Sequence, residues 1–355
     1  MKHEPLPTRR RLLRDALGFT SLATIGALPR ASAQLAPATS AARPAAVANA
    51  AAAARPTTGT QIVLLGTRAG PGIDLKRAQT STAILVDGVP YLVDCGYGAV
   101  RNLNAAEING LKIEKIAFTH LHNDHTTDLP ALLSLQWTGG RTQPIEIYGP
   151  YGTADMVRAI VDYCKADVGI RTVDEGRETS PANLYHGHDI DPGSKITEVF
   201  RDERVKVTAI ENTHFPEHSR SRMPYRSMGL RFDTKTRSVV ISGDTSYSKN
   251  LVELAKDVDV FICEVMDQSV RDAFLVQQKQ DPQDADKPSV ARHVSETHST
   301  PEEVGRMAAE AKAKLVVLNH QLTSAGTTLP LAPLLEGVRR FYAGEVVFGQ
   351  DLLTI

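Results

Sequence analysis

The sequence predicts an α/β sandwich, in which β-sheets are covered by helices. Three observations lead to this prediction: a β-hairpin signal early in the chain, an alternation of strands and helices later, and no internal repeat. The 355 residues are 42% hydrophobic, which is enough to form a substantial core.

The early elements are short apolar runs separated by turn residues. A first strand is expected to begin near Gln61. Residues 83–86 and 91–94 flank Asp87 and Gly88, a pair that favours a tight hairpin turn because both residues tolerate positive φ. The next expected elements are a helix at 99–109, a strand at 115–118 and a helix at 129–136.

The later part of the chain alternates strands with helices. The helix expected at 301–312 is preceded by a capping box, Thr300 to Glu303, with Pro301 at its first position. Two polar stretches, 165–200 and 277–299, are predicted to be long loops that serve as lids or inserts. The remaining expected elements are strands at 206–210, 238–241, 258–262 and 315–318 and a helix at 251–256.

The N-terminus has the three parts of an export signal. Arg9 and Arg10 precede a mildly apolar stretch, 16–28, and a small-residue cleavage sequence that ends at Ala33. Paired arginines in this setting are typical of the twin-arginine signal. We predict a twin-arginine signal peptide over 1–33, an Ala/Pro-rich linker over 34–59 and one folded domain over 60–355.

The export signal predicts a location in the periplasm or outside the cell, reached through the twin-arginine export machinery. The apolar stretch is too short to span a bilayer as a stable anchor, and cleavage would remove it, so no membrane anchor is expected after processing. Lys and Arg number 40 against 41 Asp and Glu, a net charge of -1, so no overall attraction to nucleic acid is expected. Cys95, Cys164 and Cys263 are too few and too widely spaced for a disulfide framework.

The densest group of metal-ligand residue types follows the strand expected at 115–118. It consists of His120, His122, Asp124 and His125. In an extended segment alternate residues share a side, so His120, His122 and Asp124 are expected to converge while His125 serves a second ion. Imidazole and carboxylate groups suit zinc and other divalent transition metals. The sequence therefore predicts a metal site at the end of this strand.

The H-x-H-x-D-H pattern after a strand resembles that of the metallo-β-lactamase superfamily. Leu65-Gly66-Thr67 looks like the opening strand and turn of that family, and Asp94 looks like its buried aspartate. The resemblance extends from about Gln61 to the C-terminus and implies a four-layer αβ/βα sandwich. The remaining matches, each at a strand end, are His214 (preferred to His218, which lies farther from its strand), Asp244 and His320.

The resemblance implies a set of ligands for two Zn²⁺ ions. His120, His122 and His214 would hold one ion, Asp124, His125 and His320 would hold the other, and Asp244 would bridge both. Two such ions would lower the pKa of a shared water and supply a bridging hydroxide as the nucleophile. Asp124 would also orient that water.

His298, just before the capped helix, resembles the His-x-Thr element of the ribonuclease Z and arylsulfatase-like branch. In those relatives the histidine can protonate the leaving oxygen, and the nearby helix N-terminus would favour a sulfate or phosphate. The sequence departs from the ribonuclease Z pattern at Cys263-Glu264, where His-Glu is expected. Glu264 could still orient His298, whereas Cys263 puts a complete nuclease relay in doubt.

These observations lead us to expect an exported di-zinc hydrolase that cleaves a small anionic ester, an aryl sulfate or a phosphodiester. The alternatives are a ribonuclease Z-like RNA phosphodiesterase and a lactonase or β-lactamase. A non-catalytic metal-binding protein would require a lost ligand, and none of the seven positions is lost. The expected partner is a small-molecule ester rather than nucleic acid, and relatives of this branch suggest a homodimer.

Overall fold

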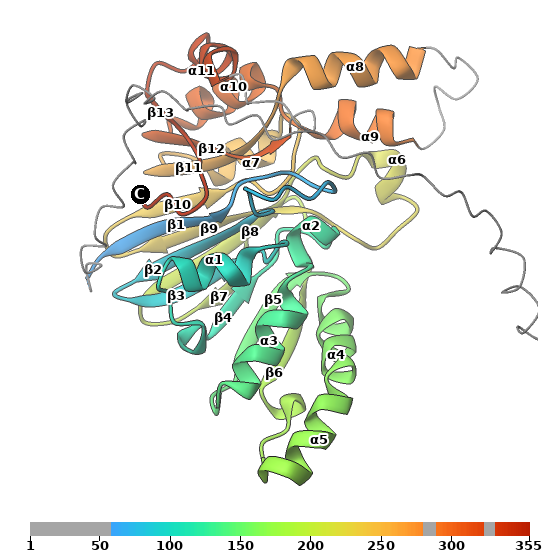
Figure 1. The fold of residues 1–355 in the computed structure, drawn as a ribbon. Helices are drawn as coiled ribbons and strands as arrows, with labels where there is room; N and C mark the ends of the chain where they lie inside the picture. The colour runs from blue at the N-terminus through green and yellow to red at the C-terminus, as the bar shows by residue number, and fades with distance from the viewer. Residues whose placement is uncertain (1–57, 280–288, 323–330) are drawn as a thin grey trace, which may run out of the picture. The chain divides into compact units, whose positions relative to one another are not determined.

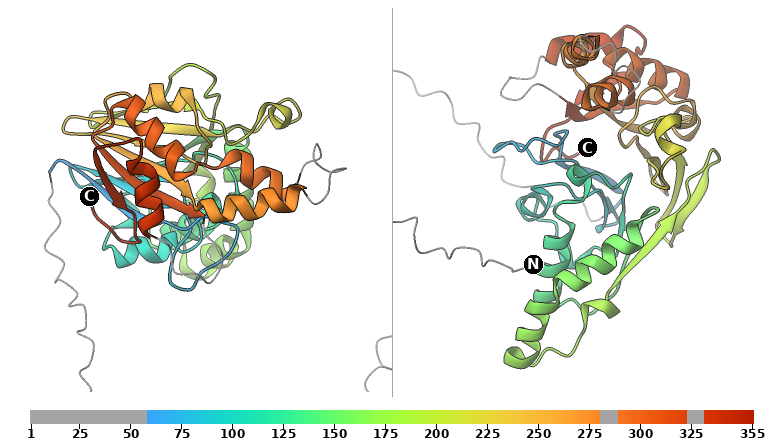
Figure 2. Two further views of the ribbon diagram at one scale, coloured as in Figure 1. Left: turned by 90° about the horizontal axis from the view of Figure 1, so that it is seen from above. Right: turned by 90° about the vertical axis from the view of Figure 1, so that its right-hand side faces the viewer.

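Two β-sheets pack face to face, and helices cover the outer face of each (Figure 1). This arrangement is seen in the computed structural model, which describes residues 58–279, 289–322 and 331–355. Figure 2 shows the two groups of helices on opposite sides of the paired sheets. The predicted four-layer αβ/βα sandwich is thereby confirmed.

The element bounds are as follows. The first sheet contains β1 (Thr60–Gly66), β2 (Ser81–Val86), β3 (Val89–Val93), β4 (Lys115–Ala117), β5 (Ile145–Pro150) and β6 (Tyr185–Ile190). The second sheet contains β7 (Thr197–Arg201), β8 (Val205–Glu211), β9 (Met228–Thr234), β10 (Ser238–Ile241), β11 (Val260–Met266), β12 (Leu315–Leu322) and β13 (Glu345–Phe348). The described helices are α1 (Ala99–Ala105), α2 (Asn123–Thr126), α3 (Leu129–Thr138), α4 (Thr153–Tyr163), α5 (Lys165–Glu175), α6 (Glu217–Arg220), α7 (Lys249–Leu254), α8 (Gln268–Lys279), α9 (Val290–Thr297), α10 (Pro301–Ala311) and α11 (Leu331–Arg339).

Strand direction brings several loops to one rim of the sandwich. In the first sheet the strands from β3 to β6 are parallel, and in the second sheet those from β10 to β13 are parallel. The carboxyl ends of parallel strands meet at one edge of a sheet, where α/β folds place their chemistry. The hairpin predicted between β2 and β3 is confirmed, with Asp87 at φ 49° and Gly88 at φ 79°.

Three apolar layers hold the sandwich together. Ile62, Ile84 and Phe232 belong to the layer between the two sheets. Alternate residues of a strand face opposite sides, so β11 contributes Ile262 to this inner layer and Phe261 to the outer one. The first outer layer packs α1, α3 and α4 against the first sheet, and the second packs α7, α10 and α11 against the other.

The capping box predicted before α10 is present. The Glu303 backbone N–H donates to Thr300 Oγ1 at 3.3 Å, and the Thr300 backbone N–H donates to Glu303 Oε2 at 2.8 Å. Two donors that the first helical turn leaves unpaired are satisfied in this way. The start of α10 therefore has a defined position, and Ser299 and His298 directly precede it.

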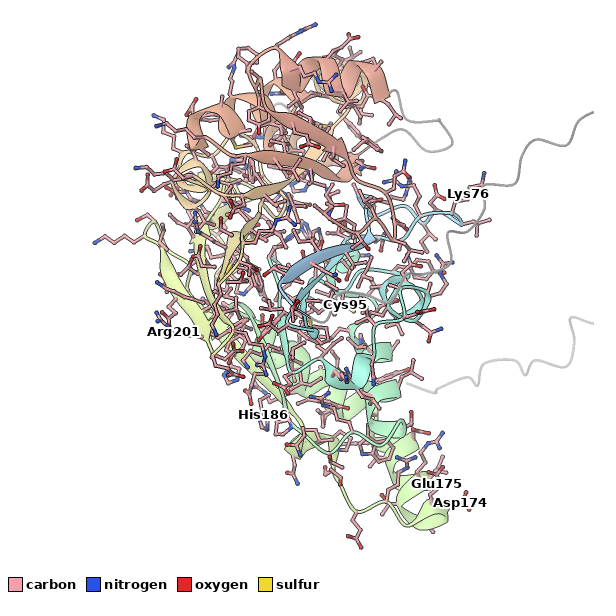
Figure 3. The ribbon with its side chains drawn as sticks, turned by 90° about the vertical axis from the view of Figure 1, so that its left-hand side faces the viewer. Lys76, Cys95, Asp174, Glu175, His186 and Arg201 are labelled. Carbon is pink, nitrogen blue, oxygen red and sulfur yellow. The ribbon has the colours of Figure 1, made fainter. Side chains whose placement is uncertain are left out.

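The prediction of a loop is wrong for 165–200 and for the part of 277–299 that the structure describes, whereas residues 280–288 lie outside the described residues. The first stretch contains α5, β6 and most of β7, and the second contains α9. No residue of α5 is buried, and β6 is a largely polar edge strand, so neither has the buried apolar face by which a helix or strand is recognised in a sequence. Figure 3 shows Asp174 and Glu175 at the far end of α5, well separated from Cys95.

The predicted signal peptide and nearly all of the predicted linker lie outside the described residues. Among the helices that the structure describes, none has the length and apolar character needed to cross a membrane.

Candidate metal centre

The predicted ligand residues come together where strands of both sheets end. His120 and His122 follow β4, His214 follows β8, Asp244 follows β10, and His320 belongs to β12. In Figure 1 the short helices α2 and α6 and the helix α9 lie on the same side of the two sheets, beside these strand ends. The side chains form two adjacent groups.

The first group consists of three histidines. The Nδ1 atom of His122 lies 3.0 Å from Nε2 of His120 and 3.2 Å from Nε2 of His214. His120 and His214 are fully buried. Burial lowers the pKa of each well below its ordinary value, and neighbouring histidines lower it further. Neutral imidazoles with converging nitrogens are the form in which histidine binds a transition metal.

The second group consists of Asp124, His125, Asp244 and His320, all buried. The Nε2 atom of His320 lies 3.2 Å from both Asp124 Oδ2 and Asp244 Oδ1. Burial alone would lower the pKa of His320, but Asp244 and the hydrogen bond with Asp124 raise it to about 10. The same negative charge would attract a divalent cation.

Two orphaned atoms support a metal in the second group. His125 Nε2 and Asp244 Oδ1 are buried and 3.2 Å apart, yet neither forms a hydrogen bond within the described residues. Buried polar atoms without partners are rare in folded proteins and call for an explanation such as an ion. The residues present therefore fit a metal cofactor, and a set of imidazole and carboxylate ligands is typical of zinc.

The carboxylate of Asp244 faces both groups. Its Oδ1 atom lies 3.2 Å from the Nε2 atoms of His125 and His320, in the second group. Its Oδ2 atom lies 3.8 Å from the Nε2 atoms of His120 and His214, in the first. One carboxylate thus presents a different oxygen to each group.

Asp124 does not lie with His120 and His122, so the expectation from an extended segment is wrong. A short helix, α2, begins at Asn123 with His122 as its N-cap. The helical turn directs Asp124 and His125 to the same side, where the Gly70 backbone N–H donates to Asp124 Oδ2 at 2.7 Å. A Cβ atom on Gly70 would lie 2.4 Å from the Asp124 side chain, so only glycine permits this approach.

Asp94 positions the His125 ring through the nitrogen that faces away from the second group. The Asp94 Oδ2 atom lies 2.9 Å from His125 Nδ1, and its Oδ1 atom accepts from the Thr119 backbone N–H at 2.8 Å. A carboxylate on Nδ1 leaves Nε2 as the nitrogen directed at the second group. Asp94 adopts φ 56° and His320 φ 37°, backbone strain of the kind that concentrates at functional sites.

His298 and Glu264 form a buried pair beside the second group. Their Nδ1 and Oε2 atoms are 2.8 Å apart, and the same oxygen lies 3.8 Å from His320 Nδ1. Burial alone would lower the pKa of His298, but the Glu264 carboxylate raises it. Cys263 belongs to the outer apolar layer, so the departure from His-Glu at this position does not displace Glu264.

His293 and Phe215 also lie at the site, although neither was predicted from the sequence. The His293 ring centroid lies 4.9 Å from that of His214 and 5.6 Å from that of His122. The Phe215 ring lies 5.5 Å from His122 and 5.0 Å from His214. The adjacency of Phe215 to His214 in the chain was a usable signal, whereas His293 lies in a segment that was taken for a loop.

His186 and His188 do not belong to the metal centre. Both belong to the edge strand β6 and contact the Glu146 carboxylate of β5, with 3.0 Å between His186 Nδ1 and Glu146 Oε1. The Cys95 backbone N–H donates to the His125 carbonyl, so Cys95 lies next to the metal centre. In Figure 3 the His186 side chain is well separated from Cys95.

Comparison with known proteins places this geometry in a family. Residues 90–321 match the family described as the beta-lactamase superfamily domain. Ribonuclease Z of Mycobacterium avium (strain 104) is 28% identical over 298 residues, which are 82% of this chain and 96% of the relative. Ribonuclease Z of Enterococcus faecalis (strain ATCC 700802 / V583) is 28% identical over 293 residues, 73% of this chain and 86% of the relative.

Solved structures share the fold. The short form of human tRNase Z superposes with a TM-score of 0.57 at 24% identity, over 83% of this chain and 98% of that one. A metallo-β-lactamase fold protein from Bacillus subtilis superposes with a TM-score of 0.58 at 17% identity, over 83% and 98% of the two chains.

Two expectations from the sequence are corrected by these relatives. The leading expectation for the substrate, an aryl sulfate or another small anionic ester, is wrong, because ribonucleases Z match most of the chain. The expectation that nucleic acid is an unlikely partner is wrong for the same reason. Net charge sums the whole surface, whereas phosphate recognition depends on the local field of the site.

Proposed function

Because the chain belongs to the beta-lactamase superfamily, we propose that it is a metal-dependent phosphodiesterase that acts on RNA. The observation that carries the proposal is the Asp244 carboxylate, which presents one oxygen to each of two ligand groups. Two cations held side by side are suited to phosphodiester cleavage, because they can act on the attacking and the leaving oxygen. The ribonuclease Z relatives supply the substrate class.

The proposed ligands are those of the two groups. His120, His122 and His214 would hold one zinc ion, Asp124, His125 and His320 would hold the second, and Asp244 would contact both. Two zinc ions would supply an activated water and neutralise the developing charge on the phosphate. Asp94 keeps His125 in the required orientation through the bond to its Nδ1 atom.

His298 is the proposed proton donor to the leaving oxygen. Its Nδ1 atom is engaged by Glu264, so Nε2 is the nitrogen that remains to carry the proton. The Thr245 backbone N–H donates to the other oxygen of Glu264, which fixes the carboxylate. Glu264 is thus a positioning residue, and His298 is the residue that meets the substrate.

Two measurements test the proposal. The zinc-loaded wild type is expected to hold two zinc ions per chain and to cleave both bis(p-nitrophenyl) phosphate and a precursor transfer RNA. Asp244→Asn should lower the affinity for the second ion by more than about 100-fold, beyond the loss typical of an outer-shell change. The matched control is Asp162→Asn, whose carboxylate is 66% exposed in a surface pair with Lys165.

The outcomes separate the parts of the proposal. A wild type that hydrolyses a chromogenic β-lactam or a lactone and no phosphodiester would refute the proposed function. Full zinc content and activity in the Asp244→Asn variant would refute the shared carboxylate. Cleavage of bis(p-nitrophenyl) phosphate without any RNA would restrict the enzyme to small phosphodiesters and refute the substrate class.

A further inference from the structure

A cavity of about 420 Å³ opens beside the three-histidine group. His122 belongs both to that group and to the cavity wall. The other walls come from the segment after His214 and from α9, which lie far apart in the chain. The volume lies within the range of small-molecule binding sites, roughly 300–1,000 Å³.

The cavity wall is mainly apolar. Leu121, Phe215 and Met223 supply carbon and sulfur surface, and Tyr225 adds a second aromatic ring. Phe215 stands edge-on to His122, with an interplanar angle of 85°, so this aromatic wall continues directly into the metal centre. Such a surface gains little from a ribose or a phosphate, both of which are strongly hydrated.

The polar side of the cavity is formed by α9. Arg292 lies with its Nε 3.1 Å from Glu296 Oε1 and its Nη2 3.4 Å from His218 Nδ1. His293, one residue further on, lines the same cavity. A ligand in the cavity would therefore meet aromatic and thioether surface on one side and hydrogen-bonding groups on the other.

We propose that this cavity binds a nucleobase next to the scissile phosphate. The inference rests on the proposed function, because it assigns the cavity to the part of an RNA substrate that is flat, apolar on its faces and polar at its edges. Aromatic side chains bind bases by stacking, and methionine adapts to flat aromatic surfaces. Since the cavity and the metal centre share His122, a base bound in the cavity would lie beside the phosphate.

Binding by stacking would make this cavity select for the presence of a base. Every base offers a π-face, so binding by stacking depends on the presence of a base more than on its identity. Met223 and Tyr225 are then specificity-determining residues that distinguish a nucleotide from a phosphodiester without a base. Phe215 contacts ligand histidines as well, so a change there would disturb both sites.

The experiment compares a dinucleoside monophosphate with analogues in which one base at a time is replaced by hydrogen. The wild type, loaded with zinc, is expected to lose roughly 10- to 100-fold in kcat/KM when the base on one side is removed, the loss typical of one stacked base. Met223→Ala/Tyr225→Ala should show a similar loss on the complete substrate and little further loss on that analogue. Zinc content and thermal unfolding of each variant are measured alongside.

The matched control is Leu135→Ala/Tyr163→Ala, which removes two side chains that are 57% and 73% exposed outside the cavity. It should behave like the wild type on every substrate. Two results would overturn the inference: a wild type that is indifferent to removal of either base, or a cavity variant that loses the same factor with and without the base. In either case continued cleavage of bis(p-nitrophenyl) phosphate and of a precursor transfer RNA would leave the proposed function intact, whereas the absence of both activities would refute that function itself.

Discussion

At the scale of single residues, Asp244 carries a buried negative charge that its surroundings must compensate. Its carboxylate is 2% exposed and sits among His120, His125 and His320. Burial would raise its pKa, but these histidines hold the pKa well below its ordinary value, so the carboxylate stays charged. A buried charge is tolerated only when opposite charge surrounds it. The geometry is therefore built for positive charge on both sides of one carboxylate.

The proposed role of His298 gives a prediction at the same scale. A ribose oxygen leaves poorly without a proton, whereas nitrophenolate leaves unaided, and general acids contribute about 100- to 10,000-fold. His298→Asn should therefore lower kcat on RNA by about 100-fold or more and on bis(p-nitrophenyl) phosphate by less than about 10-fold. The two rates are compared at equal zinc content. Equal losses on both substrates would contradict the role as proton donor.

At the scale of elements, strand alternation places the His298–Glu264 pair. In β11, Phe261, Cys263 and Val265 enter the outer apolar layer, and the intervening residues face the other side. Glu264 is the point at which this second face reaches the rim and meets His298. Cys263 is thus a core residue. The replacement of His-Glu by Cys263-Glu264 therefore leaves the His298–Glu264 pair in place.

Asp259 ties together the starts of three strands, and this gives a prediction about stability. Its Oδ2 atom accepts from the backbone N–H and the hydroxyl of Ser238, each at 2.8 Å, and its Oδ1 atom accepts from Lys314 Nζ at 2.7 Å. Burial alone would raise the pKa of Asp259, but these donors lower it to about 2. The folded pKa lies below the unfolded one, so the stabilisation is complete above about pH 4 and is lost as pH falls toward 2.

Asp259→Asn should therefore lower the free energy of unfolding by about 1 kcal/mol at pH 7, a value reduced for partial exposure. The difference from the wild type should shrink as pH falls from about 4 toward 2. Urea unfolding at several pH values measures it, with Asp162→Asn as the exposed control. A loss that is the same at all pH values would show that Asp259 acts through its hydrogen bonds without its charge.

At the scale of the whole molecule, the export signal remains a proposal about residues that the structure does not describe. Lysine keeps the charge of Arg9 and Arg10 but lacks the planar guanidinium, so Arg9→Lys/Arg10→Lys should block recognition by the twin-arginine machinery. The variant is expected to stay unprocessed in the cytoplasmic fraction, while the wild type loses its first 33 or so residues. Fractionation and intact mass measure both. Identical processing and location of the two proteins would contradict the prediction.

The difference between local and global charge explains the error about nucleic acid. A net charge of -1 describes the whole chain, whereas a substrate meets one rim of the sandwich. On that rim, two groups of metal ligands supply sites for cations that the sum of Lys, Arg, Asp and Glu does not count. Overall charge could therefore not decide between a small ester and RNA.

The sequence by itself determined the features that depend on neighbours along the chain. These include the hairpin at Asp87, the capping box at Thr300, and the positions of His120 and Asp244 just beyond strand ends. Each is encoded by local steric preference, by hydrogen bonding within a few residues, or by apolar periodicity.

Only the tertiary structure decided which residues meet. The helical turn at α2 moved Asp124 to the side of His125, and packing of two sheets brought Asp244 between the two ligand groups. His293 became a neighbour of His214 because α9 folds over the rim, although its polar sequence predicted a loop. Contacts between distant segments arise from the packing of whole layers, and no periodicity within one segment specifies them.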